Sequence, residues 1–233
     1  MSAPLLILRP QPGADRTAAR ARARGLATVI APLFTVRPLA WTAPEGSYDA
    51  VMLTSANAAR HAGDGLTPYL KLPCHAVGET TAEAAREAGF LDVITGPADG
   101  GALMADMAGA GIRSALWPCG LDRATPDDVG IRIAAVPVYV AEPIEFLPPE
   151  ADAALRAGAV ALLHSRRAAA CFAALAAAYR RTTRVAALSE AVAQAAGDGW
   201  AGIAAADRPR DEALLELAAK LCQTDREMRP PHA

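Results

Sequence analysis

The feature that most constrains this fold is a duplicated stretch. Residues Tyr48–Phe90 return in diverged form as Val160–Trp200. In each copy a short apolar run ends in a polar pair, Thr54-Ser55 in the first and His164-Ser165 in the second, and a helical segment follows. The copies lie about 110 residues apart. In a chain of 233 residues, which exceeds the usual ~100–150 residues of one domain, this duplication predicts two similar lobes.

Composition narrows the class of protein. With 52% hydrophobic and 21% charged residues, the chain has an ordinary globular composition. Its net charge of -2 provides no electrostatic basis for binding nucleic acid or an anionic membrane. The first apolar run, Leu5–Leu8, is too short for a signal peptide, and no apolar stretch approaches the ~20 residues of a membrane span. We therefore expect a cytoplasmic monomer without nucleic-acid or membrane partners.

The cysteines show no metal-ligand spacing. They lie far apart, with no C-x-x-C pair, at Cys74, Cys119, Cys171 and Cys222. This pattern predicts reduced, mostly buried thiols, with no metal site and no disulfide framework.

The chain begins with a strand–helix–strand unit. Leu5–Leu8 reads as a buried strand, and a helix follows over Asp15–Arg24, which Gly25 ends. Val29–Val36 reads as a second strand, interrupted by Pro32. The pattern returns in mid-chain.

There, Ala115–Pro118 is apolar, residues 119–123 read as a turn, and Ile133–Val140 reads as a strand. When the prolines of the two second strands are aligned, Phe34 falls opposite Tyr139. After the second copy, the sequence predicts a short strand, a last helix over Asp211–Cys222 and a tail that frays.

This alternation of short apolar runs and helices predicts an α/β fold with parallel strands joined by crossover helices. The strands near residues 36 and 140 read as paired connectors between the lobes. We therefore expect one discontinuous lobe, residues 1–36 with 142–228, and one continuous lobe, residues 40–138. The linkers would lie near 36–40 and 138–142.

Candidate ligand-binding residues follow from this topology. In open parallel sheets, ligands sit at the carboxyl ends of strands, against helix N-termini that favour anions. If the two lobes face each other, their donors would line one cleft suited to a substrate with several carboxylates. The residues at such strand ends are Arg9, Thr54, Ser55, Gly78, Gly120, Ser165 and Ser189.

Each of these features also has a structural interpretation. Ser55 and Ser165 can be plain helix caps, and Thr80-Thr81-Ala82-Glu83 can be a capping box. Tyr139 can simply cover the connector strands. The pair His164-Ser165 suggests a hydrolase, but the G-x-S-x-G motif is absent.

Taken together, these residues resemble the uroporphyrinogen-III synthase family over nearly the full chain. The likeness rests on the order and spacing of several short motifs rather than on any one of them. These are Leu8-Arg9-Pro10, Leu53-Thr54-Ser55 with Asn57-Ala58, Ala76-Val77-Gly78, Thr80-Thr81-Ala82-Glu83-Ala84, Pro118-Cys119-Gly120 with Arg123, and Pro137-Val138-Tyr139.

The resemblance implies two flavodoxin-like lobes joined by a two-stranded linker, with the substrate between them. It implies cyclodehydration of hydroxymethylbilane, a linear tetrapyrrole with eight carboxylates, with inversion of the last pyrrole ring and without cofactor or metal. Tyr139 would donate a proton to the leaving hydroxyl, and Thr80, Thr81 and Arg123 join the substrate-binding candidates.

The second copy departs from the family pattern. His164 stands where threonine is common, Ser189 where glycine is usual, and Ala191-Val192 where the threonine pair would be. These changes make carboxylate binding by the second copy less certain but do not indicate loss of activity. Because fold alone does not fix function, two alternatives stay open beside the enzyme, namely a two-lobed small-ligand binding protein and an inactive family member.

Overall fold

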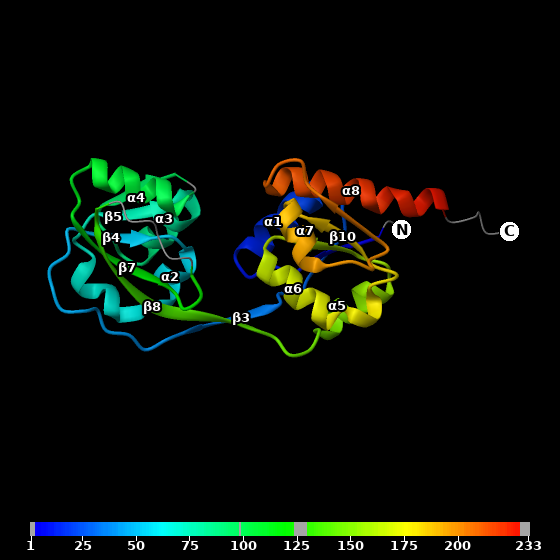
Figure 1. The fold of residues 1–233 in the computed structure, drawn as a ribbon, viewed down its shortest axis with the longest axis horizontal. Helices are drawn as coiled ribbons and strands as arrows, with labels where there is room; N and C mark the ends of the chain where they lie inside the picture. Colours follow the sequence, from blue (N-terminus) through cyan, green and yellow to red (C-terminus); the bar gives the residue numbers. More distant parts are fainter. Residues whose placement is uncertain (1–2, 98, 124–129, 229–233) are drawn as a thin grey trace. The chain divides into compact units, whose positions relative to one another are not determined.

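The computed structural model describes residues 3–97, 99–123 and 130–228. The chain divides into two compact units, one formed by Met1–Thr35 with Pro143–Ala233 and the other by Val36–Glu142. Figure 1 shows that the chain passes between them twice, within β3 (Phe34–Pro38) and at the end of β8 (Arg132–Pro143). These two segments run antiparallel, since Leu39 N donates to Val138 O at 2.9 Å and Ile144 N to Leu33 O at 3.0 Å.

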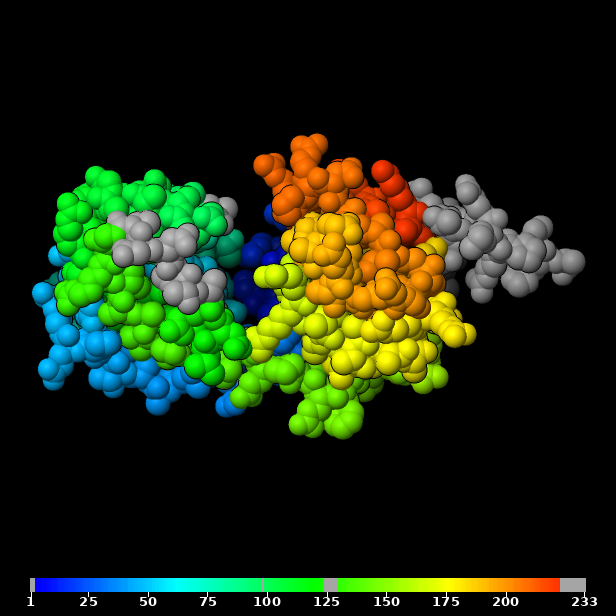
Figure 2. All heavy atoms as spheres, in the orientation of Figure 1, coloured from blue at the N-terminus to red at the C-terminus, as the bar shows by residue number. Residues whose placement is uncertain are grey.

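The first unit contains a five-stranded parallel sheet in the order β11-β10-β9-β1-β2. Numbered along the chain, this is the 2-1-3-4-5 order of flavodoxin-like folds. Helices α6 and α7 lie side by side in this unit (Figure 1), and the yellow and orange atoms of this part of the chain adjoin in the space-filling view (Figure 2). The strands are β1 (Leu5–Ile7), β2 (Thr28–Ile30), β9 (Val160–Leu163), β10 (Arg184–Ala187) and β11 (Gly202–Ala205), and the helices are α1 (Gly13–Ala23), α5 (Pro149–Arg156), α6 (Arg166–Leu175), α7 (Glu190–Ala196) and α8 (Asp211–Met228).

The second unit has the same strand arrangement in circularly permuted form. Its sheet order is β3-β8-β7-β4-β5-β6, and the five strands after β3 are parallel. The strands not yet given are β4 (Ala50–Leu53), β5 (Cys74–Val77), β6 (Val93–Gly96) and β7 (Ser114–Gly120), and the helices are α2 (Ala56–His61), α3 (Gly78–Glu87) and α4 (Gly100–Gly109). The predicted fold class, two parallel α/β units, is confirmed.

The duplicated stretches form the same succession of elements. Each contains a strand, a helix followed by a short 3-10 helix, a second strand and a second helix. Both copies then turn at a glycine with positive φ, Gly89 at +98° and Gly199 at +88°, a conformation that favours glycine. The aromatic residue after each glycine, Phe90 or Trp200, is buried. The two copies therefore share their turns and their core anchors.

Several predicted boundaries were wrong. Val29–Val36 is not one strand, because β2 belongs to the sheet of the first unit and β3 to the six-stranded sheet. Pro32, which cannot donate a ladder hydrogen bond, lies in the gap between them. Residues 119–120 belong to β7 rather than to a turn, and the last helix runs past Cys222 to Met228.

Apolar side chains cover both faces of the six-stranded sheet. One core cluster includes Val51 and Leu116. The other, which includes Met52, Met104 and Trp117, packs β4 and β7 against α4. This division follows from the alternation of side chains along a strand, and it places the indole of Trp117 on the α4 face.

The predicted burial of most cysteine side chains is confirmed. All four cysteines are free thiols; Cys74, Cys119 and Cys222 are buried and Cys171 is partly exposed. Within the described ranges, no helix is both long and apolar enough to cross a lipid bilayer.

Candidate active site

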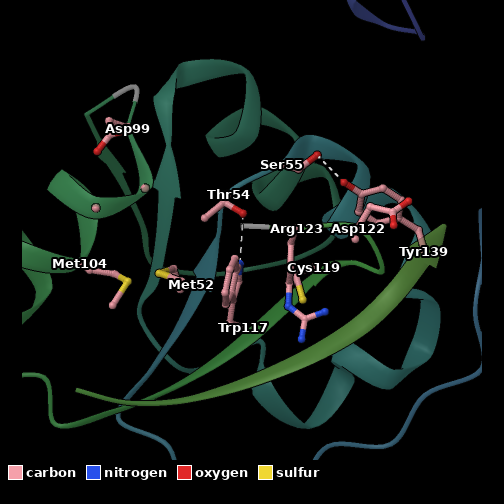
Figure 3. Close-up of a pocket in the computed structure, with 13 residues that line it drawn as sticks. Met52, Thr54, Ser55, Asp99, Met104, Trp117, Cys119, Asp122, Arg123 and Tyr139 are labelled. Carbon is pink, nitrogen blue, oxygen red and sulfur yellow. Dashed lines mark hydrogen bonds between the residues drawn. The ribbon is translucent and has the colours of Figure 1, made fainter. Parts of the chain in front are cut away.

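A pocket of about 440 Å³ lies in the second unit, where the strand order reverses between β4 and β7. Such a switch point is the usual ligand site of open parallel sheets, because the two diverging connections leave a crevice at the strand ends. Residues from β4, β7, β8 and α4 surround it (Figure 3). They are Met52, Thr54, Ser55, Asp99, Gly100, Gly101, Met104, Trp117, Cys119, Gly120, Asp122, Arg123 and Tyr139.

A β-bulge aims Tyr139 at this pocket. Cys119 pairs with Pro137, but the next residue of β7, Gly120, pairs with Tyr139, so the register shifts by one residue at this point. Bulges beside active sites commonly redirect a side chain in this way. Gly120 makes the room, since a Cβ at this position would lie 2.9 Å from Tyr139 Cζ and 3.0 Å from its hydroxyl oxygen.

The hydroxyl of Tyr139 lies 3.3 Å from Ser55 Oγ (Figure 3). Ser55 is the N-cap of α2, and its Oγ accepts a hydrogen bond from Asn57 N at 3.2 Å. The cap interpretation of Ser55 is therefore confirmed, and the same oxygen also contacts the tyrosine. One side chain thus links the start of α2 to the candidate proton donor.

The pocket combines one cation, Arg123, with two carboxylates, Asp99 and Asp122. Of the described residues that line it, Arg123 alone carries a positive charge, and its guanidinium lies 5.9 Å from the centre of the Trp117 ring. Asp99 turns its carboxylate onto its own helix, where it accepts from Ala102 N at 2.9 Å. Gly100 and Gly101 bring the first turn of α4 to the pocket, and N–H groups there have no intrahelical acceptor and favour anions.

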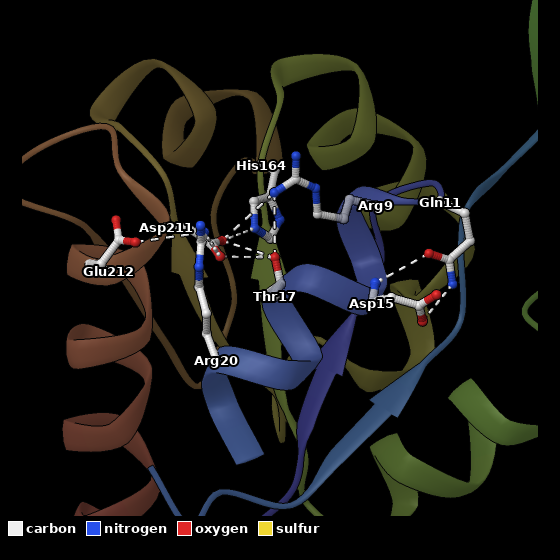
Figure 4. A network of polar contacts seen from close by, with 8 residues as sticks. All are labelled: Arg9, Gln11, Asp15, Thr17, Arg20, His164, Asp211 and Glu212. Carbon is white, nitrogen blue, oxygen red and sulfur yellow. Dashed lines mark hydrogen bonds and ion pairs between the residues drawn. The ribbon is translucent and has the colours of Figure 1, made fainter. Parts of the chain in front are cut away.

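The corresponding switch point of the first unit, between β1 and β9, holds a closed polar network instead (Figure 4). Asp211, at the start of α8, accepts hydrogen bonds from Thr17 at 3.0 and 3.1 Å and from Arg20 at 3.0 Å. It also lies 3.0 Å from His164 Nε2 and 3.7 Å from Arg9 Nη1. The predicted anion-binding residue Arg9 therefore already faces a carboxylate of its own unit.

Burial and hydrogen bonding set the protonation of this network. Burial lowers the pKa of His164, and this effect outweighs the opposing influence of Asp211. For Asp211, burial raises the pKa, but hydrogen bonds from His164, Arg20 and Thr17 outweigh burial and hold the pKa well below its usual range. At neutral pH the network thus joins a neutral imidazole to a charged carboxylate.

The structure brings together five of the predicted site residues, Thr54, Ser55, Gly120, Arg123 and Tyr139, around the pocket of the second unit. The other predicted residues do not line it. Arg9, Ser165 and Ser189 belong to the first unit, whereas Gly78, Thr80 and Thr81 belong to α3.

The predicted capping box at Thr80 was wrong. Helix α3 begins at Gly78, whose φ of +66° lets the chain turn directly from strand into helix. Thr80 and Thr81 therefore lie inside the first turn, and Thr81 is buried. Ser165 caps α6 by accepting from Ala168 N at 3.1 Å, while Ser189 makes no side-chain cap bond.

Sequence reasoning missed α4 and most of the apolar pocket lining. Asp99-Gly100-Gly101 follows a short strand, and an aspartate at that position is a typical N-cap signal. Trp117 stood within a predicted strand with nothing local to mark it as a pocket residue. Met52 and Met104 likewise read as ordinary core residues.

The fold and this pocket define a class: a two-unit, flavodoxin-like α/β protein with a ligand pocket at the switch point of its second unit. The model of the family described as uroporphyrinogen-III synthase HemD matches residues 15–216. The chain therefore belongs to the uroporphyrinogen-III synthase family, whose function lies in heme and tetrapyrrole biosynthesis.

One solved structure shows the same fold. The crystal structure of uroporphyrinogen-III synthetase from Helicobacter pylori is 17% identical, with a TM-score of 0.60 over 94% of this chain and 99% of that chain. A mutant uroporphyrinogen III synthase from Thermus thermophilus is 15% identical, with a TM-score of 0.45 over 96% of this chain and 100% of that chain. A search of curated proteins gave no significant match.

Proposed function

We propose that this chain closes hydroxymethylbilane to uroporphyrinogen III with inversion of the last pyrrole ring, as a carbon–oxygen lyase. The observation that carries the proposal is the family match over residues 15–216. The pocket of the second unit supports it, because it places a tyrosine hydroxyl, a serine and an arginine around one crevice.

Tyr139 is the proposed proton donor. The electrons of the first pyrrole ring, which carries the hydroxymethyl group, expel the hydroxyl. The departing oxygen takes the phenol proton and leaves as water. The azafulvene cation formed at this end is attacked by the substituted carbon of the last ring, at the other end of the chain, which gives a spiro intermediate. The older bond between this carbon and its bridging carbon then breaks, and the bridging carbon bonds to the free α-carbon of the same ring, which inverts the ring. The proton lost when the final ring regains aromaticity returns to the phenolate. A well-placed general acid contributes ~10²–10⁴-fold to such a step.

Holding the flexible substrate in a reactive shape is the larger task. A pocket of about 440 Å³ takes part of a tetrapyrrole rather than the whole molecule. We propose that Thr54, Ser55, Gly120 and Arg123 hold one acidic part of the substrate there, with help from the first turn of α4. Positioning of this kind brings the reacting carbons together and lowers the barrier. Arg9, Gly78, Thr80, Thr81, Ser165 and Ser189 stay predictions.

The test is the isomer of the product. Uncatalysed ring closure yields the type I isomer, so purified protein incubated with hydroxymethylbilane should divert the product to type III. The products are oxidised and separated by chromatography. Type I product alone from well-folded protein would contradict the proposal and favour a binding protein or an inactive member.

We further propose that the enzyme acts as a cytoplasmic monomer and that, as the family resemblance implies, it needs no cofactor. Activity that survives extensive dialysis against a chelator would support the absence of a metal requirement. Light scattering at working concentration measures the mass directly. A dimer, or activity lost with the metal, would contradict this extension while leaving the ring-closing function in place.

A further inference from the structure

Trp117 contacts two polar groups of the pocket at once. Its Nε1 donates a hydrogen bond to Thr54 Oγ1 at 3.1 Å, and its ring lies 5.9 Å from the Arg123 guanidinium carbon. The indole is almost fully buried, with 5% exposure. A buried indole N–H needs an acceptor, and here the acceptor is a hydroxyl that lines the pocket.

Only one direction is possible for this hydrogen bond. An indole nitrogen can only donate, so Thr54 Oγ1 must accept and keeps its own proton for another partner. Within the described part of the chain, the Thr54 side chain makes no other hydrogen bond. Its methyl group faces α4, since Cγ2 would lie 3.6 Å from a Cβ at position 100. Threonine is stiff at χ1, so the hydrogen bond from the indole favours one rotamer of Thr54.

We propose that Trp117 is a positioning residue that fixes the Thr54 hydroxyl as a donor to a substrate carboxylate. Carboxylates only accept hydrogen bonds, so a hydroxyl whose lone pair is already engaged by a donor presents the matching group. The role rests on the proposed function, because the carboxylate belongs to the tetrapyrrole. Trp117 itself need not touch the substrate for this role.

A double-mutant cycle separates this role from simple packing. Trp117→Phe keeps a ring beneath Arg123 but removes the N–H, and Thr54→Val keeps the shape of threonine but removes the hydroxyl. We expect each change to raise KM about three- to tenfold, the value of one hydrogen bond, with a smaller change in kcat. Because both changes remove the same interaction, the double variant should be no worse than Thr54→Val alone. Multiplicative effects, or a Trp117→Phe enzyme with unchanged KM, would overturn the proposal.

Two further variants test whether the rise in KM is specific to Trp117 and whether it can be measured if Thr54→Val folds poorly. Trp41→Phe is the matched control, because Trp41 Nε1 donates to Ala62 O at 2.8 Å in the same unit and does not line the pocket. It should leave KM unchanged. If Thr54→Val folds poorly, Thr54→Ser retains the hydroxyl, and Trp117→Phe should still raise KM in that background. No effect of Trp117→Phe there would count against the role.

The hydrogen bond can also be tested without activity. The chain has three tryptophans, so a ¹⁵N–¹H spectrum should contain three indole signals. Thr54→Val should shift the Trp117 signal and leave the other two in place. If the wild type makes only type I product while this shift is seen, the proposed function fails and the hydrogen bond stands. An unshifted Trp117 signal would remove the basis of the proposal.

Discussion

Replacing Gly120 by alanine should lower kcat strongly by displacing Tyr139. The new Cβ would lie 2.9 Å from Tyr139 Cζ, 3.0 Å from its hydroxyl oxygen and 3.2 Å from Cε2. Unstrained carbon contacts lie at about 3.5–4.0 Å, so the phenol must move by roughly 0.6–1.1 Å. The contact between the Tyr139 hydroxyl and Ser55 Oγ is 3.3 Å long, so a shift of the phenol of this size changes it.

The expected decrease in kcat follows from the displacement of the Tyr139 ring. A misplacement of about 1 Å costs roughly 10²-fold in rate, which is also the lower end of what general acid catalysis contributes. We therefore expect Gly120→Ala and Tyr139→Phe each to lower kcat about 10²-fold. In the Tyr139→Phe background, Gly120→Ala should lower kcat little further, because the hydroxyl is already gone. Overpacking costs about 1–3 kcal/mol of stability.

Steady-state formation of the type III isomer measures the effect, and thermal denaturation shows that the variant is folded. Gly109→Ala is the matched control, because its added Cβ would meet no described atom within 4 Å apart from its chain neighbours and its own helix backbone, and it should retain wild-type kcat. A folded Gly120→Ala enzyme with wild-type kcat would refute the link between the bulge, the glycine and the tyrosine.

Three other predictions concern stability and reactivity. Ser55→Ala should lower the free energy of unfolding by about 1 kcal/mol through loss of the α2 cap, and it should also lower kcat. A urea titration measures the stability and an activity assay measures kcat. Unchanged stability would contradict the capping role of Ser55. Burial lowers the pKa of His164, so below about pH 6.5 the unfolded chain binds more protons and stability falls. The low pKa of Asp211 extends this loss to stronger acid. His164→Gln should remove the first part of that decline in urea titrations at stepped pH, and an equally steep decline would argue against it. Burial raises the pKa of Cys74 to about 12, so iodoacetamide should modify the partly exposed Cys171 first, as mass spectrometry of the folded protein would show; early labelling of Cys74 would contradict its burial.

Local sequence signals predicted the elements of the duplicated stretches well. The strands ending at Leu53 and Leu163 and the caps at Ser55 and Ser165 follow from apolar runs and from residues that bond helix N–H groups. These signals act within a few residues, so they can be read without a structure.

Local sequence signals did not predict helix boundaries correctly where the backbone conformation of a glycine set the boundary. The motif beginning at Thr80 has the letters of a capping box, but the left-handed conformation of Gly78 starts α3 two residues earlier. Helix α4 has an ordinary N-cap signal, Asp99, but glycines stand at both of its ends and weaken its helical pattern. A glycine conformation that is invisible in the apolar pattern decided the boundary only at Gly78.

By itself, the sequence determined the two-unit parallel α/β architecture, the family and the strand ends at which polar residues gather. Only the tertiary structure decided that Trp117, Asp99 and Tyr139 border one pocket in the second unit, whereas Arg9 is engaged by Asp211 in the first. The physical reason is that strand register and ion pairing join residues far apart in the chain. A one-residue shift between β7 and β8 redirects a side chain, and no local pattern encodes that shift.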